Sequence, residues 1–216
     1  MYFPVYLNLK GKRVVVIGGG EVAERKVISL IGTGASITVI SPEVTPQLAE
    51  LTRANSIEVL KRPYRRGDCQ SANLVLSATD NPGISMEVWN EANAAGILIN
   101  TADQPDLCDF IMPAVVRRAD LTVAISTGGT SPALAARLRQ KISRMLGPEY
   151  ERLLGLLAAA RPEIRRRIAE ERDRKALHYR ILDSDVLSLL EKNDIEGAER
   201  CMKEIIEEFA CQEKTS

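Results

Sequence analysis

The segment at residues 14–26, VVVIGGGEVAERK, constrains the fold of this chain more than any other stretch. Four apolar residues typical of strands run into three glycines, and a segment with helical periodicity follows. Gly18, Gly20 and Ala23 match the spacing G-x-G-x-x-A. Gly18 permits a tight turn, Gly20 lets the backbone approach a pyrophosphate, and Ala23 lets the helix pack closely on the strand. The pattern predicts a dinucleotide site at a helix N-terminus, with a purely structural turn as the alternative.

Strand-like and helix-like segments alternate through the first half of the chain. Strands are expected at 12–17, 36–40, 57–60, 73–78 and 97–101, and helices at 21–32, from SPEVTPQL onward and at 81–95. Strands separated by helices at this spacing predict an α/β fold with a Rossmann-like, doubly wound parallel sheet. After Pro113 the rhythm changes, because one strand at 121–126 precedes a helix at 133–146 and a charged, wholly helical tail.

The composition limits the class of protein. The 216 residues carry 29 Lys and Arg against 29 Asp and Glu, and this zero net charge argues against a dedicated nucleic-acid-binding protein. The four cysteines form no CxxC pair and have no histidine near them, which argues against a disulfide framework or a Cys/His metal site. Neither a signal peptide nor an apolar run of the roughly 20 residues that a membrane span needs is present. We therefore expect a cytoplasmic protein without a bound metal and without a membrane or nucleic-acid partner.

The end of the second expected strand bears on the kind of dinucleotide. An acidic residue that binds the ribose is expected about 20 residues after the glycines, yet Ser41 and Pro42 stand there and Glu43 is the first acid. Ribose recognition is therefore expected from Ser41, Glu43 or backbone groups. No Lys or Arg lies between Lys26 and Arg53 to bind a 2′-phosphate, so the sequence predicts NAD rather than NADP.

Two aspartates follow strands of the expected sheet. Asp80 in SATDN comes after the fourth strand, and Asp103 in NTADQPD comes after the fifth. Ligands of open parallel sheets bind beyond the carboxyl ends of the strands, so both residues fall at the edge where a nicotinamide would lie. Asp80 fits a helix cap as well as it fits a functional role, whereas for Asp103 function is the favoured interpretation.

The segments GGGEVAERK, SATDN, INTADQPDLCDFIMPA and AISTGGTSPALAARLR together resemble the precorrin-2 dehydrogenase family, whose members also form the N-terminal module of siroheme synthases. The resemblance covers residues 1 to about 146 well and the helical tail loosely. It implies NAD-dependent oxidation of precorrin-2 to sirohydrochlorin in siroheme biosynthesis, carried out by a homodimer. In some members the same site also inserts ferrous iron, and the sequence leaves this ferrochelatase activity open.

The resemblance also implies roles for particular residues. Asp103 corresponds to the family's essential aspartate and is expected to act as a general base or proton acceptor. The family's cofactor contacts map onto the glycine turn and the end of the second strand. With the residues of the sheet edge, the expected cofactor-binding set is Gly18, Gly19, Gly20, Glu21, Val22, Ser41, Pro42, Glu43, Thr79 and Asp80. The expected substrate-binding set is Thr127, which stands where the family often has serine, with Gly128, Gly129, Arg137 and Lys141.

The implied substrate fits the basic residues after the glycine pair. Precorrin-2 carries eight carboxylates, so its binding calls for cationic groups and backbone amides more than for many catalytic side chains. Arg137, Lys141 and Arg144 recur four and three residues apart on the expected helix and share a face. They are candidates for contacts with these carboxylates, and a solvated helix face is an equally good interpretation. The same ambiguity applies to Arg117 and Arg118.

The apolar strand at 121–126 and the helix that follows it cannot bury all their apolar side chains against each other. A homodimer through a middle dimerisation segment at 113–146 would cover them, as the resemblance implies. A helical C-terminal domain at 147–216 of the same chain is the alternative cover. Residues 1–112 then form the NAD-binding Rossmann-like domain.

Two other functions share parts of this pattern. An NAD-binding regulatory module without catalysis would share the glycine turn, but it would not need NTADQPD or a basic helix after STGGTSP. A dehydrogenase for a smaller acid would usually bring a catalytic His or Lys to the sheet edge. The single histidine, His178, is instead expected at the surface of the helical tail, and this also argues against a chelatase with histidine ligands.

Overall fold

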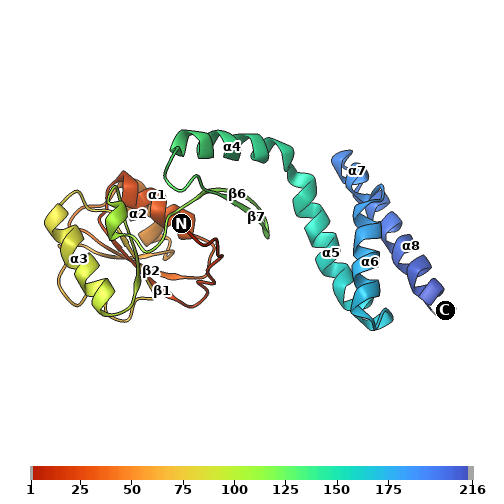
Figure 1. Cartoon of the computed structure of the whole chain (residues 1–216), viewed down its shortest axis with the longest axis horizontal. Coiled ribbons are helices and arrows are strands. Elements are labelled where there is room, and N and C mark those ends of the chain that lie inside the picture. Colours follow the sequence, from red (N-terminus) through yellow and green to blue (C-terminus); the bar gives the residue numbers. More distant parts are fainter. Residues whose placement is uncertain (1, 214–216) are drawn as a thin grey trace. The chain divides into compact units, whose positions relative to one another are not determined.

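The computed structural model describes residues 2–213, and the chain divides into two compact units, Met1–Met112 and Pro113–Ser216 (Figure 1). The first unit is built on a five-stranded sheet, and the second contains a two-stranded sheet followed by helices. The residues of the predicted middle segment and of the predicted helical domain both fall in the second unit. Each unit has its own core and is described by itself.

The sheet of the first unit is entirely parallel. Its strands are β1 (Arg13–Ile17), β2 (Ser36–Ile40), β3 (Glu58–Leu60), β4 (Leu74–Ser77) and β5 (Leu98–Thr101), in the order β3-β2-β1-β4-β5. This order places β1 at the centre with consecutive strands on either side of it. The predicted Rossmann-like, doubly wound fold is confirmed.

Helices cover both faces of this sheet. They are α1 (Glu21–Leu30), α2 (Pro46–Arg53), α3 (Pro82–Ala94) and the short 3-10 helix η1 (Pro105–Leu107). The side chains of β1 alternate between two cores, because successive residues of a strand point to opposite faces. Val14 and Val16 pack with Val27 of α1, and Val15 and Ile17 pack with Val88 of α3.

The register of the strands brings their carboxyl ends together. Ile17 pairs with Ile40 on one side and with Ser77 on the other, and Ser77 pairs with Thr101. The loops that follow β1, β2, β4 and β5 therefore leave the sheet at one edge. This edge is where ligands of doubly wound sheets bind.

The second unit begins with a hairpin of β6 (Ala114–Arg118) and β7 (Leu121–Ile125), which pair antiparallel. The sequence predicted only the second of these strands. β6 was missed because it is short, follows Pro113 directly and ends in two arginines, so it shows little apolar periodicity. Helix α4 (Pro132–Met145) follows β7.

The remaining helices pack on one another. They are α5 (Pro148–Arg167), α6 (Glu171–Leu182), α7 (Val186–Glu191) and α8 (Ile195–Glu213). Their core contains Leu153 and Ile164 of α5, Leu177 and Ile181 of α6, and Ile206 of α8. The apolar stripes of the helical tail therefore serve mainly to pack this tail on itself.

Candidate functional site

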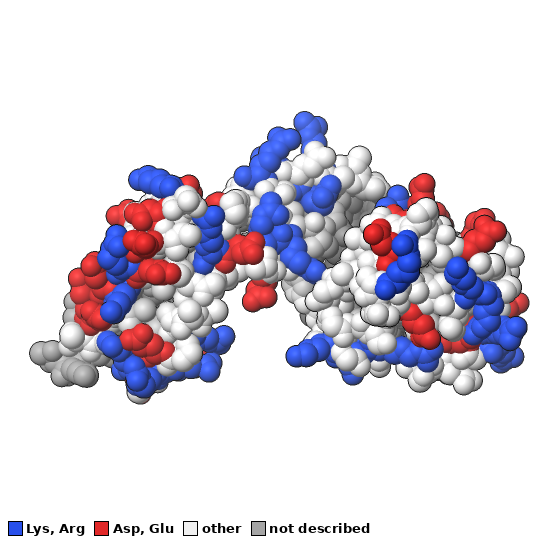
Figure 2. Space-filling model, turned by 180° about the vertical axis from the view of Figure 1, so that it is seen from behind, with Lys and Arg blue, Asp and Glu red and all other residues white. Residues whose placement is uncertain are grey.

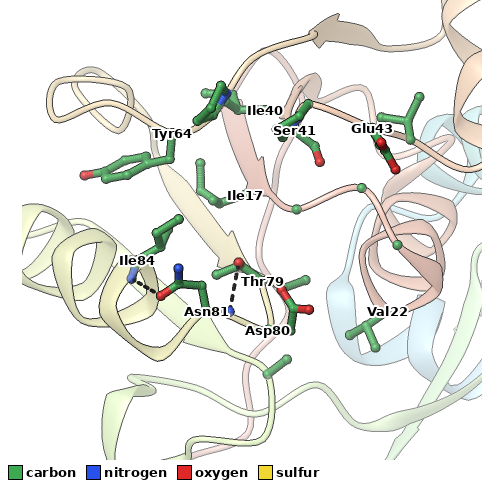
Figure 3. A pocket seen from close by; sticks show the side chains of 18 of the residues that line it. Ile17, Val22, Ile40, Ser41, Glu43, Tyr64, Thr79, Asp80, Asn81 and Ile84 are labelled. Carbon is green, nitrogen blue, oxygen red and sulfur yellow. Dashed lines mark hydrogen bonds between the residues drawn. The ribbon is translucent and has the colours of Figure 1, made fainter.

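A cavity of about 1000 Å³ opens at the carboxyl edge of the parallel sheet (Figure 3). Its walls come from the loops after β1, β2, β4 and β5, and from the loop between β3 and β4. All the residues expected to bind the cofactor line it, namely Gly18, Gly19, Gly20, Glu21, Val22, Ser41, Pro42, Glu43, Thr79 and Asp80. Asp103 lines it as well. The chain fold thus gathers residues that are up to 85 positions apart in sequence around one space.

The glycine turn is shaped by loops that cross it closely. Gly18 has a φ of +111°, and a Cβ there would lie 2.3 Å from the carbonyl oxygen of Ala78. A Cβ on Gly19 would lie 2.0 Å from the carbonyl oxygen of Glu43. The amide of Thr45 also donates to the Gly19 carbonyl at 3.0 Å. The first two glycines are therefore required by the packing of the protein on itself.

Gly20 differs from its two neighbours. A Cβ on Gly20 would meet nothing within 4 Å, so the space beside it is open. Gly20 is the N-cap of α1, and no side chain caps this helix. The first N–H groups of a helix lack intrahelical partners and carry a partial positive charge. Open space at an uncapped helix end is the geometry that a bound diphosphate requires, so the residues fit a dinucleotide here.

The end of β2 forms the part of the cavity where a ribose would be expected. Ser41 is buried with its amide bonded to the Leu60 carbonyl at 3.2 Å, whereas the Glu43 side chain is exposed. Among the described residues that line the cavity, none is Lys or Arg. The wall therefore offers hydroxyl and carboxylate groups and has no cation that would bind a 2′-phosphate.

The loop after β4 excludes one of the alternative roles of Asp80. Asn81, not Asp80, caps α3, because its side-chain oxygen accepts hydrogen bonds from the amides of Gly83 at 2.9 Å and Ile84 at 3.3 Å. The interpretation of Asp80 as a helix cap is therefore wrong. Its exposed side chain lies at the cavity (Figure 3), beside Thr79.

The loop after β5 carries Asp103 in a constrained conformation. Asp103 is exposed and has a φ of +57°, a region that favours glycine. The Cys108 sulfur holds the two ends of this turn, since it accepts from the Thr101 amide at 3.1 Å and lies 3.3 Å from the Gln104 carbonyl oxygen. Beyond it, Asp109 exchanges two 2.9 Å hydrogen bonds with the backbone of Ile99. The turn that presents Asp103 is thus tied to β5 at several points.

Lys26 does not line the cavity, but it contacts strand β5 beside the Asp103 turn, and sequence reasoning missed this contact. Its ammonium group donates to the Asn100 side-chain oxygen at 2.5 Å, and the Asn100 side chain donates to the Phe110 carbonyl at 2.8 Å. Burial lowers the pKa of Lys26, while the attraction of Cys108 and Asp103 opposes that shift. Lys26 lies in the motif GGGEVAERK, and Asn100 lies in the motif INTADQPDLCDF. The spacing of these motifs did not indicate that the two side chains are in contact.

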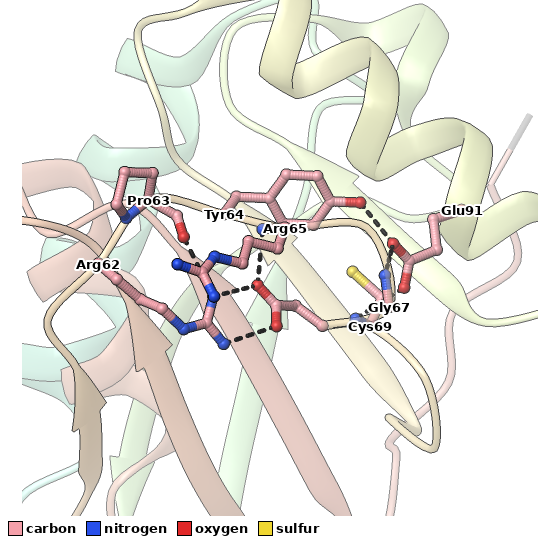
Figure 4. Close-up of polar contacts among 8 residues, drawn as sticks. Arg62, Pro63, Tyr64, Arg65, Gly67, Cys69 and Glu91 are labelled. Atoms are coloured by element: carbon pink, nitrogen blue, oxygen red, sulfur yellow. Dashed lines mark hydrogen bonds and ion pairs between the residues drawn. The ribbon is translucent and has the colours of Figure 1, made fainter.

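The loop between β3 and β4 supplies a further wall that the sequence did not predict. Tyr64 lines the cavity, and its hydroxyl donates to Glu91 of α3 at 2.5 Å (Figure 4). The Glu91 carboxylate also accepts from the amides of Gly67 and Cys69, each at 2.8 Å. Burial and the Glu91 carboxylate raise the pKa of Tyr64. One carboxylate thereby fixes the loop that forms this wall.

The expected substrate-binding residues lie in the second unit. Thr127, Gly128 and Gly129 form the turn between β7 and α4, whose glycines have φ values of +62° and +87°, and Arg137 and Lys141 are exposed on α4. The Thr127 hydroxyl accepts from the amide of Ser131 at 3.1 Å, so it shapes this turn.

Ser131 and Arg118 form hydrogen bonds at the two ends of α4. Ser131 is the N-cap of α4 and accepts from the Leu134 amide at 3.2 Å. The Arg118 guanidinium donates to the carbonyls of Leu146 and Ser143, at 2.8 and 3.0 Å. Arg118 therefore satisfies the carboxyl end of α4, and it is not a free candidate for substrate carboxylates.

His178 is half-buried and lines a second cavity in the helical tail. Within residues 2–213, no cluster of three or more His, Cys, Asp or Glu side chains is arranged to hold a metal ion. None of the helices described there combines the length and apolar character needed to cross a membrane.

Comparison with known proteins relates most of the chain to one group. Residues 5–114 match a family described as putative NAD(P)-binding, residues 118–145 one described as sirohaem biosynthesis protein central, and residues 149–206 one described as sirohaem synthase dimerisation region. The chain belongs to the precorrin-2 dehydrogenase and siroheme synthase family. The expected family resemblance is confirmed, and with it a nicotinamide dinucleotide as the cofactor class.

Individual relatives are similar over most of the chain. A siroheme synthase of Azotobacter vinelandii is 35% identical over 202 residues, which cover 94% of this chain and 44% of that protein. A siroheme synthase of Pseudomonas entomophila is 42% identical over 164 residues, 76% of this chain and 35% of that protein. This chain thus spans less than half the length of these relatives. A solved structure named SirC, precorrin-2 dehydrogenase, has a TM-score of 0.76 at 25% identity, and the match covers 94% of this chain and 100% of that one.

Proposed function

We propose that this chain oxidises precorrin-2 to sirohydrochlorin with NAD in the cytoplasm, as a step of siroheme biosynthesis. The observation that carries this proposal is the single cavity that the glycine turn shares with Asp103. A glycine turn alone would serve a binding module equally well. A constrained aspartate on the wall of the same cavity is what catalysis on a bound substrate requires.

The roles of the residues follow from their positions. The uncapped N-terminus of α1 binds the diphosphate, and Ser41 and Glu43 bind the adenosine ribose. NAD, when bound, supplies the hydride acceptor. The oxidation removes a hydride and a proton from precorrin-2, and the Asp103 carboxylate accepts that proton. A role as general base agrees with its exposure and with the fixed turn that carries it.

The choice of NAD over NADP rests on the charge of the cavity wall. Its described lining has no Lys or Arg, and the Glu43 carboxylate would repel a 2′-phosphate. We expect kcat/KM with NAD to exceed that with NADP at least tenfold, since a missing charged hydrogen-bond partner costs about 1.5–3 kcal/mol. Steady-state rates with both cofactors test this, and an NADP preference would refute it.

Substrate binding is assigned to the turn at Thr127, Gly128 and Gly129 and to the exposed cations Arg137 and Lys141 of α4. Guanidinium and ammonium groups are the natural partners of a substrate with eight carboxylates. Replacing both cations with glutamine should raise the KM for precorrin-2 and leave the KM for NAD unchanged. An unchanged KM for precorrin-2 would instead mean that this face of α4 is exposed to solvent and does not bind the substrate.

A homodimer is proposed from the apolar side of α4. Leu134, Leu138 and Met145 are exposed to 48%, 36% and 66%, and their spacing of four and seven residues places them on one helix face. An apolar stripe of this kind is usually covered by a partner. Light scattering at micromolar concentration should give twice the chain mass, and a monomer would contradict the proposal.

The decisive experiment measures the absorbance change of precorrin-2 with NAD. Asp103→Asn should lose turnover by at least a hundredfold and keep its affinity for NAD, because the carboxylate is the proton acceptor. Asp106→Asn, an exposed aspartate on the same loop, is the matched control and should retain turnover. NAD binding without turnover in the wild type would favour the regulatory module.

Adding Fe²⁺ to purified sirohydrochlorin in the same preparation determines whether the protein is also a ferrochelatase.

A further inference from the structure

A second cavity, of about 610 Å³, lies between α5 and α6 in the helical tail. Two arginines of α5, Arg161 and Arg165, face it from one side. Arg174, Lys175 and His178 of α6 face it from the other. Arg161 and Arg165 are four residues apart, as are Arg174 and His178, so each pair lies on one side of its helix. The cavity therefore concentrates basic side chains from two helices.

The charges that face this cavity do not balance. Four permanently cationic side chains line it against the single carboxylate of Glu171. In the described part of the chain, no ion pair joins Arg161, Arg165 or Lys175 to an acid. The chain as a whole is neutral, and in Figure 2 acidic and basic side chains are interspersed over the first unit and over the helical tail. The excess of three positive charges is thus a local feature.

One of these cations is held in place by the protein. The Arg174 guanidinium donates to the backbone carbonyls of Ile168 and Ala169 just beyond the end of α5, at 3.0 Å for Ile168. These bonds use one guanidinium nitrogen, so the others remain able to donate to a ligand. A cation fixed in this way loses little side-chain entropy when an anion binds.

The cavity also has an apolar side. Ile164, Tyr179 and Leu182 line it, and Tyr179 and Leu182 are 56% and 47% exposed. A small inorganic anion would leave these side chains in water. An organic anion with a flat or aliphatic body would cover them while its charges meet the arginines, which bind carboxylates in a bidentate manner.

We propose that the α5–α6 cavity is a binding site for an organic polycarboxylate with an apolar body. The site stands on its own geometry and does not depend on the proposed oxidation. Its ligand is either the tetrapyrrole substrate, bound through its carboxylates, or a different polycarboxylate of the cell. Both sources share the chemistry that the cavity recognises, and they differ in their effect on catalysis.

The test uses the full chain and the fluorescent octacarboxylate uroporphyrin as the probe. In one variant Arg161→Gln and Arg165→Gln are combined, and Lys175→Gln is a second, milder variant. The matched control combines Arg166→Gln and Arg172→Gln, two exposed arginines of the same helices that do not line the cavity. We expect the cavity variants to bind uroporphyrin at least tenfold more weakly than wild type, and the control to bind within twofold. Equal affinity in all variants would overturn the proposal.

Two further measurements separate the alternatives. If the KM for precorrin-2 rises in the cavity variants, the bound carboxylates belong to the substrate, and if it stays unchanged, the ligand is a different polycarboxylate. A weaker affinity accompanied by a change of mass in light scattering counts against the proposal, because the cations would then hold a second copy of the chain. Inactive wild type with normal uroporphyrin binding would refute only the proposed oxidation.

Discussion

The ammonium group of Lys26 donates a 2.5 Å hydrogen bond to the side-chain oxygen of Asn100, and this bond joins helix α1 to strand β5. Helix α1 begins at the glycine turn, and β5 leads directly into the turn that carries Asp103. The two parts of the proposed active site, one for the cofactor and one for proton transfer, are therefore connected through one polar contact. This contact predicts how catalysis and cofactor binding respond when it is removed.

Replacing Lys26 with Met should lower turnover of precorrin-2 about ten- to a hundredfold, because a small displacement of the Asp103 turn misaligns the proton acceptor. The affinity for NAD should change less than twofold, since the glycine turn itself is untouched. Stability should change by about 1 kcal/mol or less, because removing a partly desolvated cation offsets the lost hydrogen bond. Steady-state kinetics, NAD titration and thermal melting measure the three quantities.

Arg25→Met on the same helix is the control, because Arg25 is exposed and should behave as wild type in all three measurements. Wild-type turnover in Lys26→Met would show that the Asp103 turn holds its position without this bond. Lys26→Arg should recover part of the activity, since the guanidinium can still donate to Asn100.

Gly19 and Gly20 should respond differently to replacement by alanine. Gly20→Ala should fold with a stability loss of about 1 kcal/mol or less, because its Cβ meets nothing within 4 Å, yet NAD should bind at least tenfold more weakly. Gly19→Ala should lose about 1–3 kcal/mol of stability, because its Cβ would lie 2.0 Å from the Glu43 carbonyl oxygen. Thermal melting with and without NAD separates the two effects. A Gly20→Ala variant that binds NAD normally would show that the diphosphate does not bind beside Gly20.

Much of the first unit could be predicted from sequence because its signals are local. The apolar run before Gly18 predicts β1, and the alternation of strands and helices predicts the parallel sheet. A parallel sheet brings its strand ends to one edge, which is why Asp103 could be placed near the glycine turn. The close approach of Gly19 to Glu43 could not be predicted, because it depends on how two loops cross.

The side-chain contacts that hold the loops together could not be predicted from the sequence either. Lys26 and Asn100 are 74 positions apart, and Tyr64 and Glu91 are 27 apart. Each of these residues alone resembles an ordinary solvated polar side chain. In the second unit β6 escaped prediction for a related reason, since AVVRR gains its strand character only by pairing with β7.

Glu91→Gln should loosen the wall formed by the β3–β4 loop. The Glu91 carboxylate accepts three hydrogen bonds, from Tyr64, Gly67 and Cys69, and an amide would turn an N–H group toward at least one of these donors. We expect a stability loss of about 1–3 kcal/mol and a measurable loss of NAD affinity, because Tyr64 lines the cavity. Denaturant unfolding and NAD titration measure them. Glu87→Gln, one turn earlier and exposed, should change neither.

Contacts within the β3–β4 loop also predict that the stability of the protein depends on pH. The Arg62 guanidinium holds Asp68 through bonds of 2.7 and 2.8 Å, and the Arg65 amide adds another at 2.8 Å. These bonds, led by Arg62, lower the pKa of Asp68 below its ordinary value, against the opposing effect of burial. A carboxyl whose pKa is lower in the folded state stabilises the fold above its unfolded pKa and loses that contribution as the pH falls through the folded one.

Wild type should therefore be more stable than Asp68→Asn by a constant amount above about pH 5, and the difference should shrink below about pH 4. Thermal melting of both proteins between neutral pH and pH 3 measures this difference. Asp106→Asn, an exposed aspartate of the first unit, provides the control for general acid destabilisation. A gap between wild type and Asp68→Asn that stays the same down to pH 3 would mean that the pKa of Asp68 is the same in the folded and unfolded states, and it would refute the prediction.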